Sequence, residues 1–181
     1  MEKYIVRNLN RYAMVIMIVA ATTLTACATG KSGATAPQAV APQAETETIH
    51  RVVWHVDYRD PIRLGRMLTS VNNMLVTYEE SLSEHDIRIV FLGAGIRFVT
   101  SDKLKKTPFA EDRVMKKERT VLTERLQSAM GQGIKLELCK ITADAINLDE
   151  ATVLKGVRFV PSGVVQIVAL QRKGFGYLKA D

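Results

Sequence analysis

Two hydrophobic periods alternate along the chain after residue 48. Short apolar or β-branched runs are typical of strands, and between them apolar residues recur every three to four positions, as in amphipathic helices. The runs predict strands at residues 49–56, 86–93, 134–139 and 157–161, and a short one in "FGYLK" near the carboxyl end. The helical spacing predicts helices over about 60–81, 110–133 and 162–174.

Capping residues support the predicted helix ends. Asp60 is a good N-cap, and Pro61 suits the first helical position that follows it. Ser162 is a second N-cap, and Gly174 is the expected C-cap of the same helix. For the middle helix we expect an apolar stripe and a glycine stop; the stripe is Val114, Met115, Val121, Leu122, Leu126 and Met130, and the stop Gly131 or Gly133. Residues 96–106 predict a short helix or turn, and "LDEATVL" a helical turn.

Alternating strands and helices predict a single three-layer α/β domain. Its sheet is mainly parallel, with about five strands and helices on both faces. Ligands of such sheets bind outside the carboxyl ends of the strands. This rule selects one set of candidate binding positions: Asp57, the glycines Gly93 and Gly95, Cys139, Ser162 and Gly163.

The first 48 residues have a different character. A basic start, a short apolar run and small residues over 1–26 predict a secretory signal peptide, with a weak single-pass anchor as the alternative. "LTAC" resembles the bacterial lipobox, which implies lipidation of Cys27 and a membrane anchor. Residues 27–48 predict a flexible tether before the domain at 49–181. Because Ala28 follows Cys27, we expect an exported protein on the outer membrane, facing the periplasm.

Charge argues against a nucleic-acid partner. The formal charge of +6 falls to +4 without residues 1–26, and basic and acidic residues alternate along the chain. No aromatic–basic interleaving of the kind that binds single strands is present in the sequence.

Cys139 carries the main chemical hypothesis. Strand alternation in "IKLELC" places Lys135, Glu137 and Cys139 on one face, which we expect to be the more polar one. The cysteine also ends a strand, where following N–H groups favour a thiolate. The alternative is a small buried side chain with no chemistry. If Cys27 is lipidated, Cys139 has no disulfide partner within the chain.

Other motifs predict no further site. His50 and His55 fall on opposite faces of one strand and His85 in a loop, so we expect no metal. "GAG" lacks the third glycine of a dinucleotide fingerprint, and no cofactor is predicted. Asp57 is either an acid or base near the thiol or a solvated loop carboxylate.

Four stretches carry a family resemblance. "VVWHVDYRDPIRLGRMLTSVNNML", "IRIVFLGAGIRFV", "LELCKITADAI" and "GVRFVPSGVVQIVALQRKGFGYLK" occur in an order that resembles the DsrE/DsrF-like sulfur-relay family. The resemblance implies a parallel α/β domain that forms trimers or hexamers. It also implies that Cys139 takes up a sulfane sulfur, holds it as a persulfide and passes it to a partner thiol. The helix start at Ser162 and Gly163 would then supply N–H groups to the persulfide or to an acceptor. The competing hypothesis is a non-enzymatic periplasmic binding or interaction module in which Cys139 is structural.

Overall fold

The computed structural model describes residues 49–180. The predictions for the signal peptide at 1–26, for Cys27 and for the tether at 27–48 lie outside the described residues. No helix within residues 49–180 has both the length and the apolar character needed to cross a membrane.

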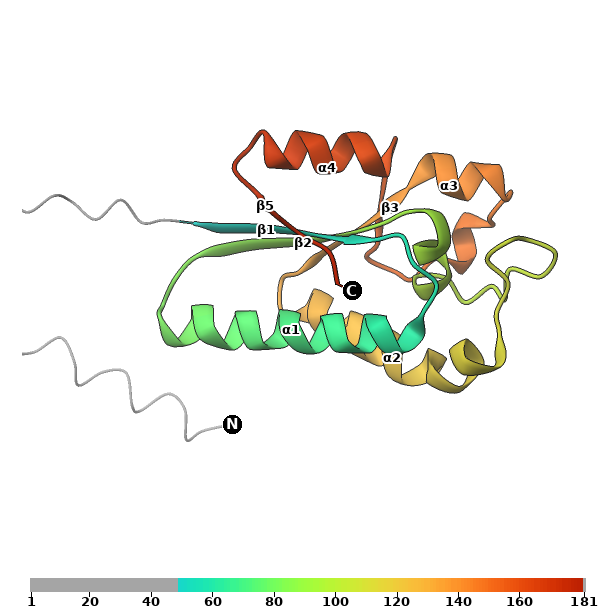
Figure 1. The fold of residues 1–181 in the computed structure, drawn as a ribbon, viewed down its shortest axis with the longest axis horizontal. Helices are drawn as coiled ribbons and strands as arrows, with labels where there is room; N and C mark the ends of the chain where they lie inside the picture. The colour runs from blue at the N-terminus through green and yellow to red at the C-terminus, as the bar shows by residue number, and fades with distance from the viewer. Residues whose placement is uncertain (1–48, 181) are drawn as a thin grey trace, which may run out of the picture. The chain divides into compact units, whose positions relative to one another are not determined.

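A five-stranded sheet forms the centre of the domain (Figure 1). The strand order is β4-β3-β2-β1-β5, and every neighbouring pair is parallel, which confirms the predicted α/β architecture. The strands are β1 (His50–Val56), β2 (His85–Phe91), β3 (Lys135–Cys139), β4 (Arg158–Val160) and β5 (Gly176–Leu178). The carboxyl ends of β1 to β4 therefore lie at one edge of the sheet.

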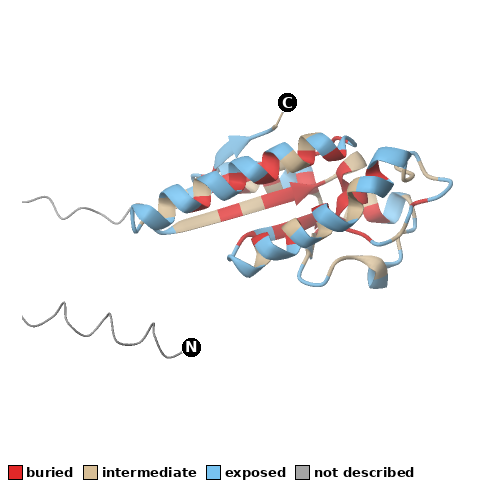
Figure 2. Cartoon of the chain, turned by 90° about the horizontal axis from the view of Figure 1, so that it is seen from below, coloured by how far each residue is buried: buried red, intermediate tan, exposed pale blue. Residues whose placement is uncertain are grey.

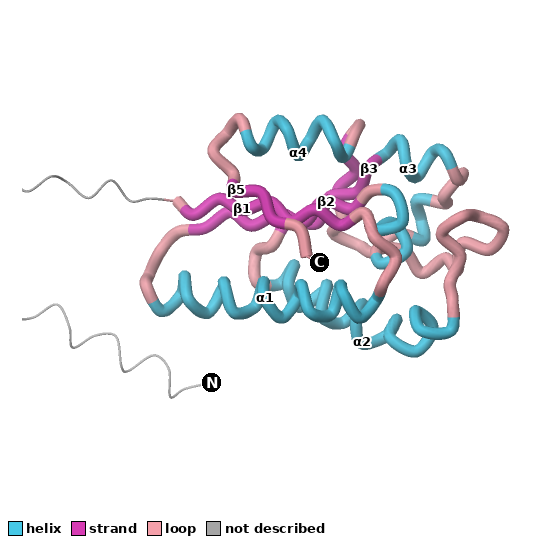
Figure 3. The backbone as a smooth tube through the Cα atoms, viewed as in Figure 1, coloured by secondary structure: helices cyan, strands magenta, loops and turns pink. Residues whose placement is uncertain are grey.

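Helices cover both faces, so the domain has three layers (Figures 1 and 3). On one face lie α1 (Pro61–Glu80) and α2 (Arg113–Gly131). On the other lies α4 (Gly163–Gln171), with α3 (Lys140–Ala145) following the end of β3. Two 3-10 helices complete the elements, η1 (Gly93–Phe98) and η2 (Glu150–Thr152). η2 lies in the turn predicted for "LDEATVL". η1 overlaps the first residues of the segment 96–106, for which a short helix or turn is predicted.

The predicted starts of the first and last helices are confirmed, whereas the middle helix begins at Arg113 instead of residue 110 and some ends and faces differ. Asp60 Oδ1 accepts a hydrogen bond of 2.8 Å from the Ile62 N–H at the start of α1. The last helix ends at Gln171, three residues before the predicted Gly174. Val114 and Val121 are exposed, because the buried side of α2 is centred on Met115, Leu122, Leu126 and Ala129. The predicted stripe therefore included two exposed valines and left out the buried Ala129.

Two apolar clusters lie on opposite faces of the sheet. The larger one fills the space beneath α1 and α2, where the buried sides of both helices face the strands (Figure 2). The smaller one joins Val53 and Val90 of the sheet to Ile167, Leu170 and Phe175. The α4 layer thus rests on few apolar contacts, and its position depends more on individual polar and backbone contacts.

We predict that Gly95→Ala destabilises the domain, because a Cβ at this position would lie 2.2 Å from the backbone oxygen of Val56. The expected loss is about 1–3 kcal/mol in the free energy of unfolding. Gly131→Ala is the matched control, since a Cβ there meets nothing within 4 Å. Urea denaturation of both variants checks the prediction, and equal midpoints would contradict it.

Candidate functional site

Cys139 ends β3 and is the N-cap residue of α3. The structure leaves it as a free thiol with only 5% of its surface exposed. Strand alternation places Cys139 and Glu137 on one face of the sheet, as expected, but this face is not open to solvent at these two residues. The α4 helix packs on it, so Glu137 is fully buried and Lys135 alone remains exposed. The contacts of Glu137 with Arg88, Arg158 and Gln166 confirm that this face is the more polar one, but Glu137 and Cys139 are buried on it.

Polar hydrogens from two helices surround the Cys139 sulfur. Burial raises the pKa of the thiol, but the N–H of Gly163 and the hydroxyl of Thr142 lower it, as do the N–H groups of Thr142 and Ile141. The lowering contributions win, and the pKa lies below its usual range. The Cys139 side chain makes no capping hydrogen bond to α3.

Gly163 lets the start of α4 pack closely on the end of β3. A Cβ at this position would lie 3.1 Å from the Cys139 Cβ and 3.2 Å from the Leu92 Cβ. Ser162 caps the helix, its Oγ accepting from the Val165 N–H at 3.5 Å. Because the first N–H groups of a helix have no partner within it, the Gly163 N–H is free to donate to the Cys139 sulfur. The predicted pair Ser162 and Gly163 thus does lie beside Cys139.

Gly93 is connected to the same site by Thr142, a residue that the sequence analysis did not select. Its N–H donates to Thr142 Oγ1 at 3.1 Å, and the Thr142 hydroxyl faces the sulfur. Gly93 also has a positive φ of 51°, which favours glycine. No local signal singles out Thr142, because Cys139 and Thr142 have the spacing of a capping box but not its residues, Ser or Thr at N-cap and Glu or Gln at N3.

Two predicted residues have other roles. Gly95 allows η1 to pack against the end of β1, as the contact with Val56 shows. Asp57 accepts from Lys179 Nζ at 2.8 Å, and its Oδ2 lies 3.6 Å from His55 Nε2. Burial is the largest influence and raises the Asp57 pKa, but the Lys179 hydrogen bond, the charges of His55 and Lys179 and a backbone hydrogen bond together lower it below its ordinary value. No hydrogen bond or ion pair within residues 49–180 links Asp57 to Cys139, so its role as the thiol's acid or base gains no support.

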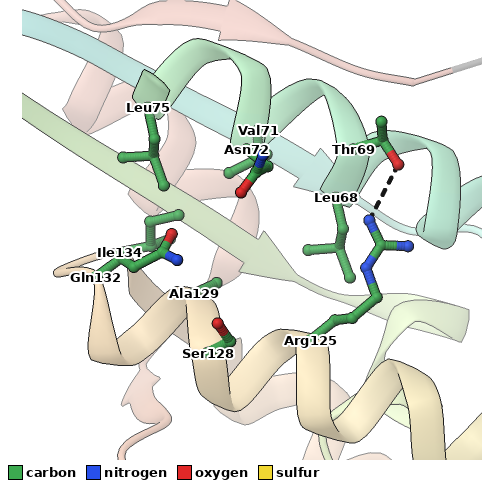
Figure 4. A pocket seen from close by; sticks show the side chains of 10 residues that line it. All are labelled: Leu68, Thr69, Val71, Asn72, Leu75, Arg125, Ser128, Ala129, Gln132 and Ile134. Atoms are coloured by element: carbon green, nitrogen blue, oxygen red, sulfur yellow. Dashed lines mark hydrogen bonds between the residues drawn. The ribbon is translucent and has the colours of Figure 1, made fainter. Parts of the chain in front are cut away.

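Cavities of the domain lie away from the thiol. One of about 240 Å³ opens between α1 and α2, where Arg125 reaches Thr69 Oγ1 at 3.0 Å (Figure 4). Another of about 560 Å³ lies near the amino end of β3, beside Arg88, Lys135 and Arg158. Among residues 49–180, no three His, Cys, Asp or Glu side chains are grouped as a metal site would need. The chemistry of the strand-end edge therefore centres on the sulfur.

Comparison with known proteins supports the fold. The profile of the DsrE/DsrF-like family matches residues 58–180. MTH1491 of Methanobacterium thermoautotrophicum, titled a protein of unknown function, is 25% identical with a TM-score of 0.56, over 72% of this chain and 98% of its own. The YchN protein of E. coli is 13% identical with a TM-score of 0.43 over the same shares. No curated protein sequence matches the chain.

We predict that Thr142→Val raises the pKa of Cys139 by roughly half a unit to one unit, because a hydrogen-bonding group that favours the thiolate is lost. Thr142→Ser keeps the hydroxyl and should leave the pKa near the wild-type value. The measurement is the pH dependence of alkylation, followed on the peptide that contains Cys139. The pH midpoint of alkylation is compared, not the alkylation rate, because the burial of Cys139 slows the reagent at every pH. The same midpoint in both variants would remove Thr142 from the site.

Proposed function

The chain belongs to the DsrE/DsrF-like family, and from this premise we propose that it carries sulfane sulfur as a persulfide on Cys139. One observation supports the proposal above all others. Polar hydrogens from the starts of α3 and α4 face a single buried sulfur and lower its pKa. A cysteine that only filled space in an apolar core would have its pKa raised by burial.

The proposed reaction is a sulfur transfer without net oxidation. The Cys139 thiolate attacks the terminal sulfur of a persulfide or polysulfide donor and forms a new S–S bond. The S–S bond of the donor breaks, and its electron pair leaves with the shortened donor as a thiolate or polysulfide anion. A thiolate on a partner protein then attacks the outer sulfur of Cys139 and takes it, which regenerates the Cys139 thiolate.

The surroundings of the thiol suit this exchange with a partner. Cys139 is covered, but the residues beside it are not: Ile141 is 62% exposed, Val164 58% and Val165 65%. We propose that the donor or acceptor approaches the sulfur over the exposed apolar side chains of Ile141, Val164 and Val165. The exposed valines of α4 also fit the homo-oligomer that we expect, since a subunit contact would cover them.

The burial of Cys139 favours a second candidate function. A thiol that is 5% exposed is also what a structural cysteine would show, because unpaired cysteine is among the most buried residue types. In that case the protein is a non-enzymatic binding or interaction module of the periplasm. Such a module would use the strand-end edge or the exposed face of α4, and its thiol would be inert.

We further propose that Cys27 anchors the protein through lipid. The support is the sequence alone, namely the signal-like residues 1–26 and the "LTAC" motif before residues 27–48. The sulfur exchange would then take place in the cell envelope, at the outer membrane facing the periplasm. Its partners would be exported protein thiols.

The sulfur-carrier proposal predicts a mass gain on one peptide. After exposure of the full-length protein to inorganic polysulfide, the peptide that contains Cys139 should gain about 32 Da, one sulfur atom. The gain should be reversed by a thiol reductant and be absent from Cys139→Ser. If no sulfur is added and the pH midpoint of Cys139 alkylation is no lower than that of an unstructured thiol, the inert module is the better account.

The anchor proposal predicts that Cys27→Ser moves the protein from the membrane fraction to the soluble fraction of the cell. Each acyl chain contributes about 0.8 kcal/mol per buried methylene, so losing the acylated cysteine should release most of the protein. Cys139→Ser is the control and should stay in the membrane fraction. If both proteins lack residues 1–26 by mass spectrometry and still partition equally, a lipid anchor on Cys27 is ruled out.

A further inference from the structure

Glu137 is a fully buried carboxylate two residues before Cys139. Because side chains alternate along a strand, the two residues share the face of the sheet that α4 covers. A buried carboxylate is costly unless it is paired and hydrogen-bonded. Its partners therefore indicate why this position holds a charge where an apolar residue would pack more simply.

The two carboxylate oxygens of Glu137 bind different parts of the domain. Oε1 accepts from Arg88 at 3.1 Å and from Arg158 at 2.5 Å, which joins β3 to both neighbouring strands. Oε2 accepts from Gln166 Nε2 at 2.7 Å, which joins β3 to α4. One side chain thus connects the sheet beneath the thiol with the helix above it.

Gln166 and Gly163 lie three residues apart on α4, so they share one side of the helix. The other sheet-facing residues of α4 are Ile167 and Leu170. Apolar contacts are non-directional and hold the helix on the sheet without setting its rotation or its height. A hydrogen bond to a carboxylate is directional and stronger than a neutral one. Glu137 therefore supplies the directional contact between α4 and the strand that carries Cys139.

We propose that Glu137 is a positioning residue for Cys139. Through its hydrogen bond with Gln166, Glu137 holds α4 where the Gly163 N–H faces the Cys139 sulfur. This inference deepens the proposed function and rests on it. The role is indirect, because the carboxylate is fully engaged by Gln166, Arg88 and Arg158. It explains a buried charge that the sulfur exchange itself does not use.

Other charged groups near this face are paired among themselves. Arg88 also binds Asp86 at 2.9 Å, and Lys135 lies 3.0 Å from the same carboxylate. Beside the cysteine, Lys140 pairs with Asp144 and with Glu150. Glu137 is distinguished from these groups by its contact with α4.

The first test replaces Gln166 with methionine, which keeps the length of the side chain and removes the donor. In full-length protein, Gln166→Met should raise the pH midpoint of Cys139 alkylation by roughly half a unit to one unit. The matched control is Gln171→Met, the same substitution at an exposed position of the same helix. It should leave the midpoint unchanged.

The second test exchanges the two side chains. In Glu137→Gln/Gln166→Glu, the amide at position 137 still accepts from both arginines through its oxygen. Its NH2 group donates to the carboxylate at position 166. The total charge is unchanged. This double variant should restore the wild-type midpoint, whereas Gln166→Glu alone, which opposes two carboxylates, should not. A loss of stability alone would not show this pattern of rescue.

The outcomes separate the two proposals. If Gln166→Met is folded by circular dichroism and its midpoint equals that of wild type, the positioning role is overturned. It is also overturned if the exchanged pair fails to restore the midpoint in a folded protein. If wild type takes up no sulfur from polysulfide but Gln166→Met still shifts the midpoint, the positioning role stands and the carrier function falls.

Discussion

The close packing of α4 on the end of β3 is the contact on which the rest of the site depends. It is possible because Gly163 has no side chain: a Cβ there would be 3.1 Å from the Cys139 Cβ. The approach brings an unpaired helix N–H to the sulfur and at the same time covers the thiol. Burial and thiolate stabilisation therefore have one cause. Seen this way, the low exposure of Cys139 does not contradict a chemical role, because the group that covers the sulfur is also one that favours its charge.

Two physical effects compete at the sulfur, and the balance between them separates the candidate functions. Desolvation favours the neutral thiol, and polar hydrogens from Gly163, Thr142 and Ile141 favour the thiolate. A module with a structural cysteine needs no such donors. A sulfur carrier needs them twice, first for the attacking thiolate and then for the anionic persulfide. Ile141 and Val164 beside the site are exposed, and the proposed exchange would take place over them.

Much of the fold could be predicted from the sequence, because strand and helix periods, caps such as Asp60 and the strand-end rule are local signals. The position of Cys139 beside Gly93, Ser162 and Gly163 followed from the same rule. The environment of Glu137 could not be predicted, since its burial depends on α4, on Arg88 and on Arg158, which are distant in the chain. Thr142 was missed because a six-residue helix such as α3 is too short to show a hydrophobic period. Asp57 looked like part of the site but pairs with Lys179 of the C-terminal segment, a contact that no local pattern shows.

The central claim is that the fold lowers the pKa of the Cys139 thiol in spite of its burial. Its most direct test is an NMR titration of the Cys139 Cβ resonance, which reports the charge of the sulfur without any reagent having to reach it. The account predicts a single titration with a midpoint below about 8.5, the value of an unperturbed cysteine. A midpoint at or above that value would show that desolvation prevails and would contradict the account.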